Sequence, residues 1–141
     1  QPIVCIQAPG CDYWDDWSAF IVKQLLKRRL INEEDLSLFK VVNSAEAAVE
    51  EISTFYRRYH SIRFVGKLMA MRLKSSISAE QLEQIQAEFC DLLSEGRFEL
   101  RAALEEELDE PAIASLPRLI FPFNRRSAGR LRQLIDHVNH L

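Results

Sequence analysis

Apolar residues occur at two regular spacings in the first 60 positions of the chain. Short, mostly apolar runs at residues 2–7 and 38–42 are typical of strands that are buried in a sheet. Over residues 13–30 and 44–59, apolar side chains instead recur three or four positions apart, as on one face of a helix. The four segments therefore predict the order β-α-β-α, which is typical of a parallel sheet covered by helices.

Polar residues mark the start of each predicted helix. Asp12 precedes the first helix, and Asn43 precedes the second with Glu46 three positions later, which is a capping-box pattern. A short helical turn is expected to begin at Asn32. The side chains that the second helix is expected to bury are Ala48, Val49, Ile52, Phe55, Tyr56 and Tyr59.

The pattern changes after residue 60, where strands of a second type are predicted. Their apolar and alternating runs lie at residues 67–74, 97–102 and 117–123. The last of these runs contains Pro122, which has no backbone N–H to donate to a neighbouring strand. We therefore expect the third strand to lie at an edge or a bend of its sheet.

Two helices are predicted among these strands. The first covers residues 79–94, where Ser78 and Gln81 form a capping box. The second follows Asn124, which is expected to cap it. The resulting order, β-α-β-β-α, is that of a ferredoxin-like split βαβ unit without its last strand.

Together these patterns predict an α/β chain in two parts. Residues 1–60 are expected to form the last β-α-β-α of a Rossmann-like parallel sheet, which is incomplete by itself, and residues 61–141 a small ferredoxin-like α+β domain. The chain opens directly on an apolar run, so we expect a larger protein whose missing N-terminal Rossmann part supplies the earlier strands. The open sheet edge also predicts a homo-oligomer.

Composition limits the possible functions. The 141 residues carry a formal net charge of −3, with 48% hydrophobic and 28% charged residues, so the chain lacks the basic surface that binds nucleic acid. No apolar run approaches the roughly 20 residues that a membrane span needs. Nothing in the chain has the pattern of a signal peptide, so the expected location is cytoplasmic.

Cysteine usage gives no disulfide framework and no metal site. Cys5, Cys11 and Cys90 are odd in number and lack paired spacing. Cys5 and Cys90 lie in apolar patterns and are expected to be core thiols. A zinc site would need a further soft ligand at suitable spacing, and the sequence provides none.

The sequence contains no complete catalytic motif. Glycine-rich dinucleotide loops, P-loops, H-E-x-x-H and G-x-S-x-G are all absent, so we assign no catalytic residue, no cofactor and no metal. The acidic run at residues 105–110 lacks the alternating ligand spacing and the glycine of a cation-binding loop. We interpret it as a solvated loop.

The stretch from residue 55 to residue 64 is the most unusual in the chain, because it combines aromatic and basic residues. Its candidate ligand-binding side chains are Arg57, Arg58, His60 and Arg63. Arginine forks bind phosphate or carboxylate groups bidentately, and the aromatic residues could stack a base. Alternatively, the aromatic side chains belong to the core and the arginines are solvated or paired with Glu50 and Glu51.

Two further places could bind a ligand. Arg125 and Arg126 are expected at the start of the last helix, where free backbone N–H groups attract anions, although an exposed helix start is the alternative. Asp12, Tyr13 and Trp14 follow the first strand at its carboxyl end, which is where ligands bind in open α/β sheets. Helix capping and aromatic packing would explain the same three residues.

Several stretches resemble the LONELY GUY (LOG) family, long described as "possible lysine decarboxylase". Residues 2–6, 9–17 and 30–32 resemble the last strand and the following helix of that family. The stretches that resemble the C-terminal extension of a longer bacterial branch are residues 56–66, 116–121 and 129–135. The similarity covers nearly the whole chain, and its motifs mark the branch rather than the chemistry.

The resemblance implies a Rossmann-like dimer that hydrolyses the N-glycosidic bond of nucleoside 5′-monophosphates, releasing a base and ribose 5-phosphate. Plant-type members activate cytokinins in this way. The family signature, a glycine-rich phosphate loop and a P-G-G-x-G-T-x-x-E stretch, is absent here and would lie upstream of Gln1. The chain is thus expected to be the non-catalytic C-terminal segment of such an enzyme, with a nucleotide monophosphate bound in the intact protein. The alternative is a non-catalytic ligand-sensing or dimerisation module.

Overall fold

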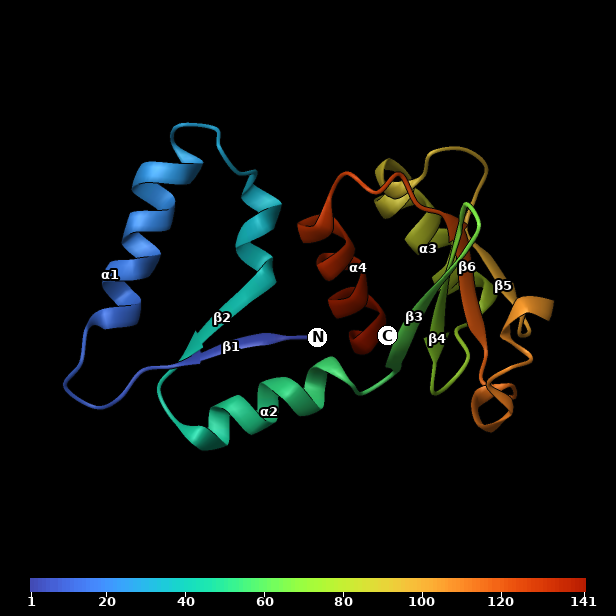
Figure 1. Ribbon diagram of the computed structural model, residues 1–141, viewed down its shortest axis with the longest axis horizontal. Coiled ribbons are helices and arrows are strands. Elements are labelled where there is room, and N and C mark those ends of the chain that lie inside the picture. The colour runs from blue at the N-terminus through green and yellow to red at the C-terminus, as the bar shows by residue number, and fades with distance from the viewer.

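Two separate sheets organise the computed structural model, which describes residues 1–141 (Figure 1). The first is a two-stranded parallel sheet, and the second is a four-stranded antiparallel sheet. Helices separate and follow the strands, so the predicted α/β class is confirmed. None of the helices combines the length and the apolar character that crossing a membrane would require.

The first sheet pairs β1 (Ile3–Ile6) with β2 (Phe39–Val42) in parallel. The segments that connect them are, in order, α1 (Tyr13–Phe20), a π-helical segment (Ile21–Leu26) and a 3-10 segment (Glu33–Leu38). After β2 the chain forms α2 (Ala45–Phe55). The predicted order β-α-β-α is therefore confirmed for this part of the chain.

Helix α2 differs from its prediction at its start and in its exposed face. Ser44, rather than Asn43, is the cap, because its Oγ accepts a hydrogen bond from the backbone N–H of Ala47 at 3.1 Å. Val49 and Ile52 were predicted to be buried but are 63% and 42% exposed. The reason is that α2 contacts β1, β2 and α4 with its other side.

The second sheet is antiparallel throughout, with the strand order β3-β4-β6-β5. Its strands are β3 (Tyr59–Val65), β4 (Leu68–Leu73), β5 (Glu99–Arg101) and β6 (Arg118–Pro122). The helices of this part are α3 (Ala79–Phe89), which has the predicted capping box of Ser78 and Gln81, and α4 (Ala128–His140). Strand β3 is additional, because its sequence pattern did not predict a strand.

The hydrophobic core lies between the second sheet and the helices α3 and α4. Alternate residues of β4 and β6 face it, and those that are completely buried are Met69, Met71, Leu73, Leu119 and Phe121. Ile85 and Phe89 of α3 and Leu134 and Val138 of α4 pack against them. Burial of each such side chain stabilises the fold by roughly 1.5–3 kcal/mol relative to exposure.

Strand β6 is an interior strand, which corrects the expectation of an edge position. Pro122 is its last residue and lies beyond Ile120, the last residue of β6 that pairs with β5. The missing N–H of Pro122 therefore removes no hydrogen bond to β5. Its carbonyl accepts a hydrogen bond from the backbone N–H of Ser94 at 2.8 Å.

The start of α4 also lies later than predicted. Ser127 is its cap, because its Oγ accepts a hydrogen bond from the backbone N–H of Arg130 at 3.2 Å. Asn124 instead accepts a hydrogen bond from the backbone N–H of Arg126 at 2.9 Å. Asn124 thus shapes the loop before the helix rather than capping the helix itself.

The cysteines are free, and two of the three are exposed. Cys5 on β1 is buried, as predicted. Cys90 is exposed, contrary to prediction, because the 3-10 turn that follows α3 turns Leu92 rather than Cys90 into the core.

Helix α4 joins the two parts of the chain and lies between them (Figure 1). One side of it packs on the second sheet, and its first turn lies against the 3-10 segment before β2. A Cβ atom built on Gly129 would overlap the backbone of Glu34, so only glycine permits this close approach. Gln133 adds a side-chain hydrogen bond of 3.2 Å to Ser37.

Candidate functional site

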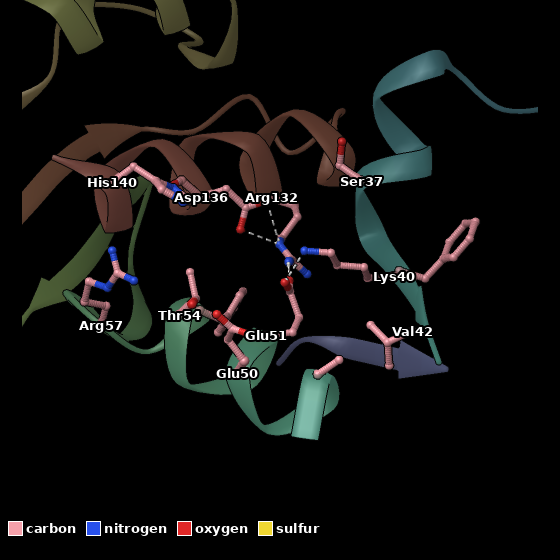
Figure 2. A pocket seen from close by; sticks show the side chains of 13 residues that line it. Ser37, Lys40, Val42, Glu50, Glu51, Thr54, Arg57, Arg132, Asp136 and His140 are labelled. Atoms are coloured by element: carbon pink, nitrogen blue, oxygen red, sulfur yellow. Dashed lines mark hydrogen bonds and ion pairs between the residues drawn. The ribbon is translucent and has the colours of Figure 1, made fainter. Parts of the chain in front are cut away.

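A groove runs between β2, α2 and α4, where the first part of the chain meets the second (Figure 2). Its volume is about 630 Å³. The ionisable side chains that line it are Lys40, Glu50, Glu51, Arg57, Arg132, Asp136 and His140. The groove is thus a polar junction site with both signs of charge on its walls.

A chain of ion pairs crosses this groove (Figure 2). Glu51 on α2 accepts hydrogen bonds from Lys40 of β2 at 2.5 Å and from Arg132 of α4 at 2.8 Å. Arg132 also contacts Asp136 at 2.8 Å, and its guanidinium lies 4.8 Å from the ring centre of Phe55. Burial raises the pKa of Asp136, although hydrogen bonds from Arg132 oppose the effect.

Arg57 is the candidate that lines this groove. It lies in the turn after α2, is exposed, and forms no ion pair or side-chain hydrogen bond within the chain. In Figure 2 it lies toward the end of the groove where His140 is found. His140 is itself held by a 2.6 Å contact between its Nδ1 and the carbonyl of Asp136. Arg57 is therefore the cation of the groove that is free to meet an incoming anion.

The other basic residues of the stretch 55–64 point elsewhere. Arg58 donates to the carbonyl of Ser76 at 3.3 Å, and His60 Nδ1 lies 2.8 Å from Ser61 Oγ. Arg63, on β3, forms ion pairs with the acidic segment before β6. The structure therefore does not bring the four candidates together in one cluster, and none of them pairs with Glu50 or Glu51.

Arg125 and Arg126 lie in the loop between β6 and α4. The guanidinium of Arg125 lies 4.6 Å from the ring centre of Phe64 and donates to the carbonyl of Gly66 at 3.2 Å. Arg126 is exposed and its side chain has no partner. Because α4 begins only at Ala128, the two arginines do not form its first turn.

At the carboxyl end of β1, the polar contacts centre on Gln7. Its Oε1 accepts a hydrogen bond from the backbone N–H of Trp14 at 2.9 Å, and its Nε2 donates to Asp15 at 2.5 Å. A cavity of about 390 Å³ here is lined by Gln7 and Asp15 but not by Asp12, Tyr13 or Trp14. Tyr13 is 66% exposed. Asp15 is thus the carboxylate that this strand end presents.

Sequence reasoning missed a second charged site, on the face of the second sheet that is turned away from the core. Arg72 of β4 and Arg118 of β6 are both buried there, and Glu107 lies between them with no exposed surface. The acidic run 105–110 is therefore not a solvated loop throughout, which corrects the prediction. The signal that could have identified the site is an arginine within each of two apolar strands, together with one long acidic run.

The electrostatics of this second site favour ionised carboxylates. Burial opposes ionisation of Glu107, but hydrogen bonds from Arg72, Arg118 and the backbone N–H of Leu104 outweigh it and lower its pKa. Hydrogen bonds from Arg72 and Arg63 lower the pKa of Glu110.

The chain matches no protein-family model, no curated protein and no solved structure. The arrangement of the chain's own elements and side chains is therefore the basis for proposing a function.

Proposed function

We propose that this chain is the non-catalytic C-terminal part of a nucleoside 5′-monophosphate phosphoribohydrolase similar to the LOG family, and that β1 and β2 complete a Rossmann-like sheet. The observation that carries the proposal is the isolated parallel pair β1–β2, whose Ile3 and Ile6 are 56% and 49% exposed. Parallel sheets occur almost only with both faces covered. Further strands and helices of a larger domain would cover these residues.

The helices that flank this pair support the same proposal. Val49 and Ile52 of α2 and Phe20 of α1 are exposed apolar residues on elements that adjoin β1 and β2. Apolar surface of this extent on connected elements is typical of an interface. The remaining part of a Rossmann-like domain is the partner that would bury it.

The second part of the chain fits the role of an appended unit. Strand β4, helix α3, strands β5 and β6, and helix α4 follow the β-α-β-β-α order of a ferredoxin-like unit, and β3 adds a strand beside β4. The groove between the two parts would then lie beside the nucleotide-binding domain. Arg57, which has no partner in the chain, is the residue that we expect to contact the nucleotide's anionic groups.

The test is to compare this chain with the full reading frame that contains it. We expect the frame to encode a P-G-G-x-G-T-x-x-E stretch upstream of Gln1. The complete product should release ribose 5-phosphate from AMP or a cytokinin riboside monophosphate, whereas this chain alone should not. A frame without that stretch, or turnover by this chain alone, would contradict the proposal.

A second candidate function is dimerisation through the edge of the second sheet. Strand β3 has seven residues, and the backbone groups of residues 60–65 form no hydrogen bond outside the sheet. The opposite edge strand, β5, has only three residues and carries Glu99 and Arg101. Short length keeps an edge strand from pairing, so the longer β3 is the edge suited to a second copy.

This alternative is tested by light scattering on the wild type and two variants. Phe64 is 48% exposed on β3, so Phe64→Glu should dissociate a β3-mediated dimer. Leu30→Glu, at a 68% exposed site in the first part of the chain, should not. A monomeric wild type, or a dimer that Phe64→Glu leaves intact, would exclude it.

A further inference from the structure

Arginines from adjacent strands lie directly opposite one another on the second sheet. Arg72 of β4 pairs in register with Arg118 of β6, and Arg118 pairs with Arg101 of β5. Arg63 of β3 extends the same positively charged face. Like charges directly opposite each other destabilise a sheet, so this arrangement requires anions close by.

Those anions come from the acidic strap, which we define as residues 105–110. Glu107 bridges Arg72 Nε, at 2.8 Å, and Arg118 Nε, at 3.4 Å. Glu110 places Oε1 2.7 Å from Arg63 Nη1 and 2.8 Å from Arg72 Nη2, and its Oε2 lies 3.0 Å from Arg72 Nη1. Asp109 contacts Arg63 at 2.5 Å. The strap thus occupies the arginines in the way that a bound oxyanion would.

The two halves of this arrangement differ in burial. The side chain of Glu107 has no exposed surface, whereas those of Glu110 and Asp109 are 39% and 63% exposed. The exposed Asp109–Arg63 pair contributes little net stability, so this carboxylate can be displaced at low cost. Glu110 also pairs with Arg72, which is 5% exposed, so its displacement requires an anion that binds Arg72 at least as well. A phosphate group carries more charge than a carboxylate and binds the same arginine forks bidentately.

A further observation is that the strap does not satisfy all the donors. Arg118 is completely buried, and its Nη2 atom has no hydrogen-bond partner. An unpaired donor on a buried cation is unfavourable, so the buried end of this arginine network, beside Glu107, is not fully satisfied by the strap. Ser61 adds a hydroxyl group 3.4 Å from Arg72 Nη1.

We propose that Arg63, Arg72 and Ser61 form a binding site for the phosphate group of a small molecule. In the absence of that ligand, the carboxylate of Glu110 occupies the site. The ligand and the strap compete for the same guanidinium groups, so binding displaces Glu110 and Asp109 and loosens residues 108–116. Glu107 stays in place between Arg72 and Arg118, so the buried part of the network keeps a net positive charge. The site is separate from the groove between β2, α2 and α4, and it does not depend on the function proposed above.

Hydrogen exchange on the wild-type chain, with inorganic phosphate as the probe, tests the competition directly. Phosphate should accelerate exchange of the backbone amides of residues 108–116, while sodium chloride at the same ionic strength should not. The amides of β4 and β6 should be unaffected. Equal exchange in the two salts would overturn the proposal, because it would show that phosphate does not compete with the strap.

Calorimetry on three variants provides the second measurement. The Glu110→Gln substitution removes the competing carboxylate, so it should tighten phosphate binding by about tenfold or more. Adding Arg63→Gln to that variant should abolish the gain. Glu106→Gln is the matched control, because Glu106 is exposed and pairs with no arginine. Unchanged affinity in a folded Glu110→Gln variant would refute the site, and if that variant does not fold, the exchange experiment decides.

Discussion

The side-chain carbonyl of Asn139 accepts a hydrogen bond of 2.9 Å from the backbone N–H of Tyr59, 80 residues earlier in the chain. The same oxygen accepts a second hydrogen bond from the backbone N–H of Arg58 at 2.8 Å. The Asn139 side-chain NH₂ donates to the carbonyl of Phe55. One side chain of α4 thereby fixes both the end of α2 and the start of β3.

We expect Asn139→Ala to lower the free energy of unfolding by about 3 kcal/mol, because it leaves three backbone groups without partners. Urea unfolding followed by circular dichroism measures the change. Asn43→Ala is the matched control, since Asn43 is exposed, and it should stay within about 0.5 kcal/mol of the wild type. Equal stability of the two variants would show that water replaces the Asn139 contacts.

Gly129→Ala should weaken the contact between α4 and the 3-10 segment before β2. The added methyl group would overlap the backbone of Glu34, and backbone cannot move aside as a flexible side chain can. We expect a loss of about 2 kcal/mol, as for other overpacked sites, although alanine is the better helix former. An unchanged or raised melting temperature would mean that the 3-10 segment moves away freely.

Arg132→Gln should destabilise the fold at neutral pH by about 3 kcal/mol, because Glu51 and Asp136 would lose their shared cation. Lys40→Gln should cost less than about 1 kcal/mol, since Lys40 is largely exposed. The pKa of Asp136 is already raised by burial. Removing the nearby cation should raise the pKa of Asp136 further. Asp136 then becomes neutral as the pH falls, so the loss of unfolding free energy in Arg132→Gln should shrink. A deficit independent of pH would contradict this account.

Stability should also fall in acid through the acidic strap. The pKa of Glu107 is lower in the folded chain than its ordinary value of 4.5, so the folded state binds fewer protons there. Its contribution is therefore present above pH 4.5 and lost as the pH falls through the folded pKa. Urea unfolding between neutral pH and strong acid should show this loss, and Glu107→Gln should show a smaller one. An equal loss of unfolding free energy with falling pH in the wild type and in Glu107→Gln would contradict this prediction.

The spacing of apolar residues alone predicted most of the helices and strands. The reason is that the apolar side of most of these elements packs against neighbours in the same part of the chain. Strand β3 was missed for a physical reason. Phe55, Tyr56 and Tyr59 continue the helical spacing of α2, whereas contacts with the distant Asn139 and pairing with β4 end that helix and start the strand. A long-range contact of this kind leaves no local pattern in the sequence.

The candidate sites show the same limit. Arg57, Arg58 and Arg63 are close in sequence, but a turn and a strand direct their side chains to different places. Composition alone indicated a solvated acidic loop. The burial of Glu107 depends on Arg72, 35 residues away, and Arg118, 11 residues away.

The position of α4 has a consequence for the order of folding. This helix is made after all the elements against which it packs, which are the second sheet and the segment before β2. While the chain emerges from the ribosome, neither of its two parts can therefore finish folding until residues 128–140 are available. Such high contact order slows folding, and it exposes the apolar strands to other chains during synthesis. Chaperone binding to the nascent chain should accordingly persist until α4 emerges.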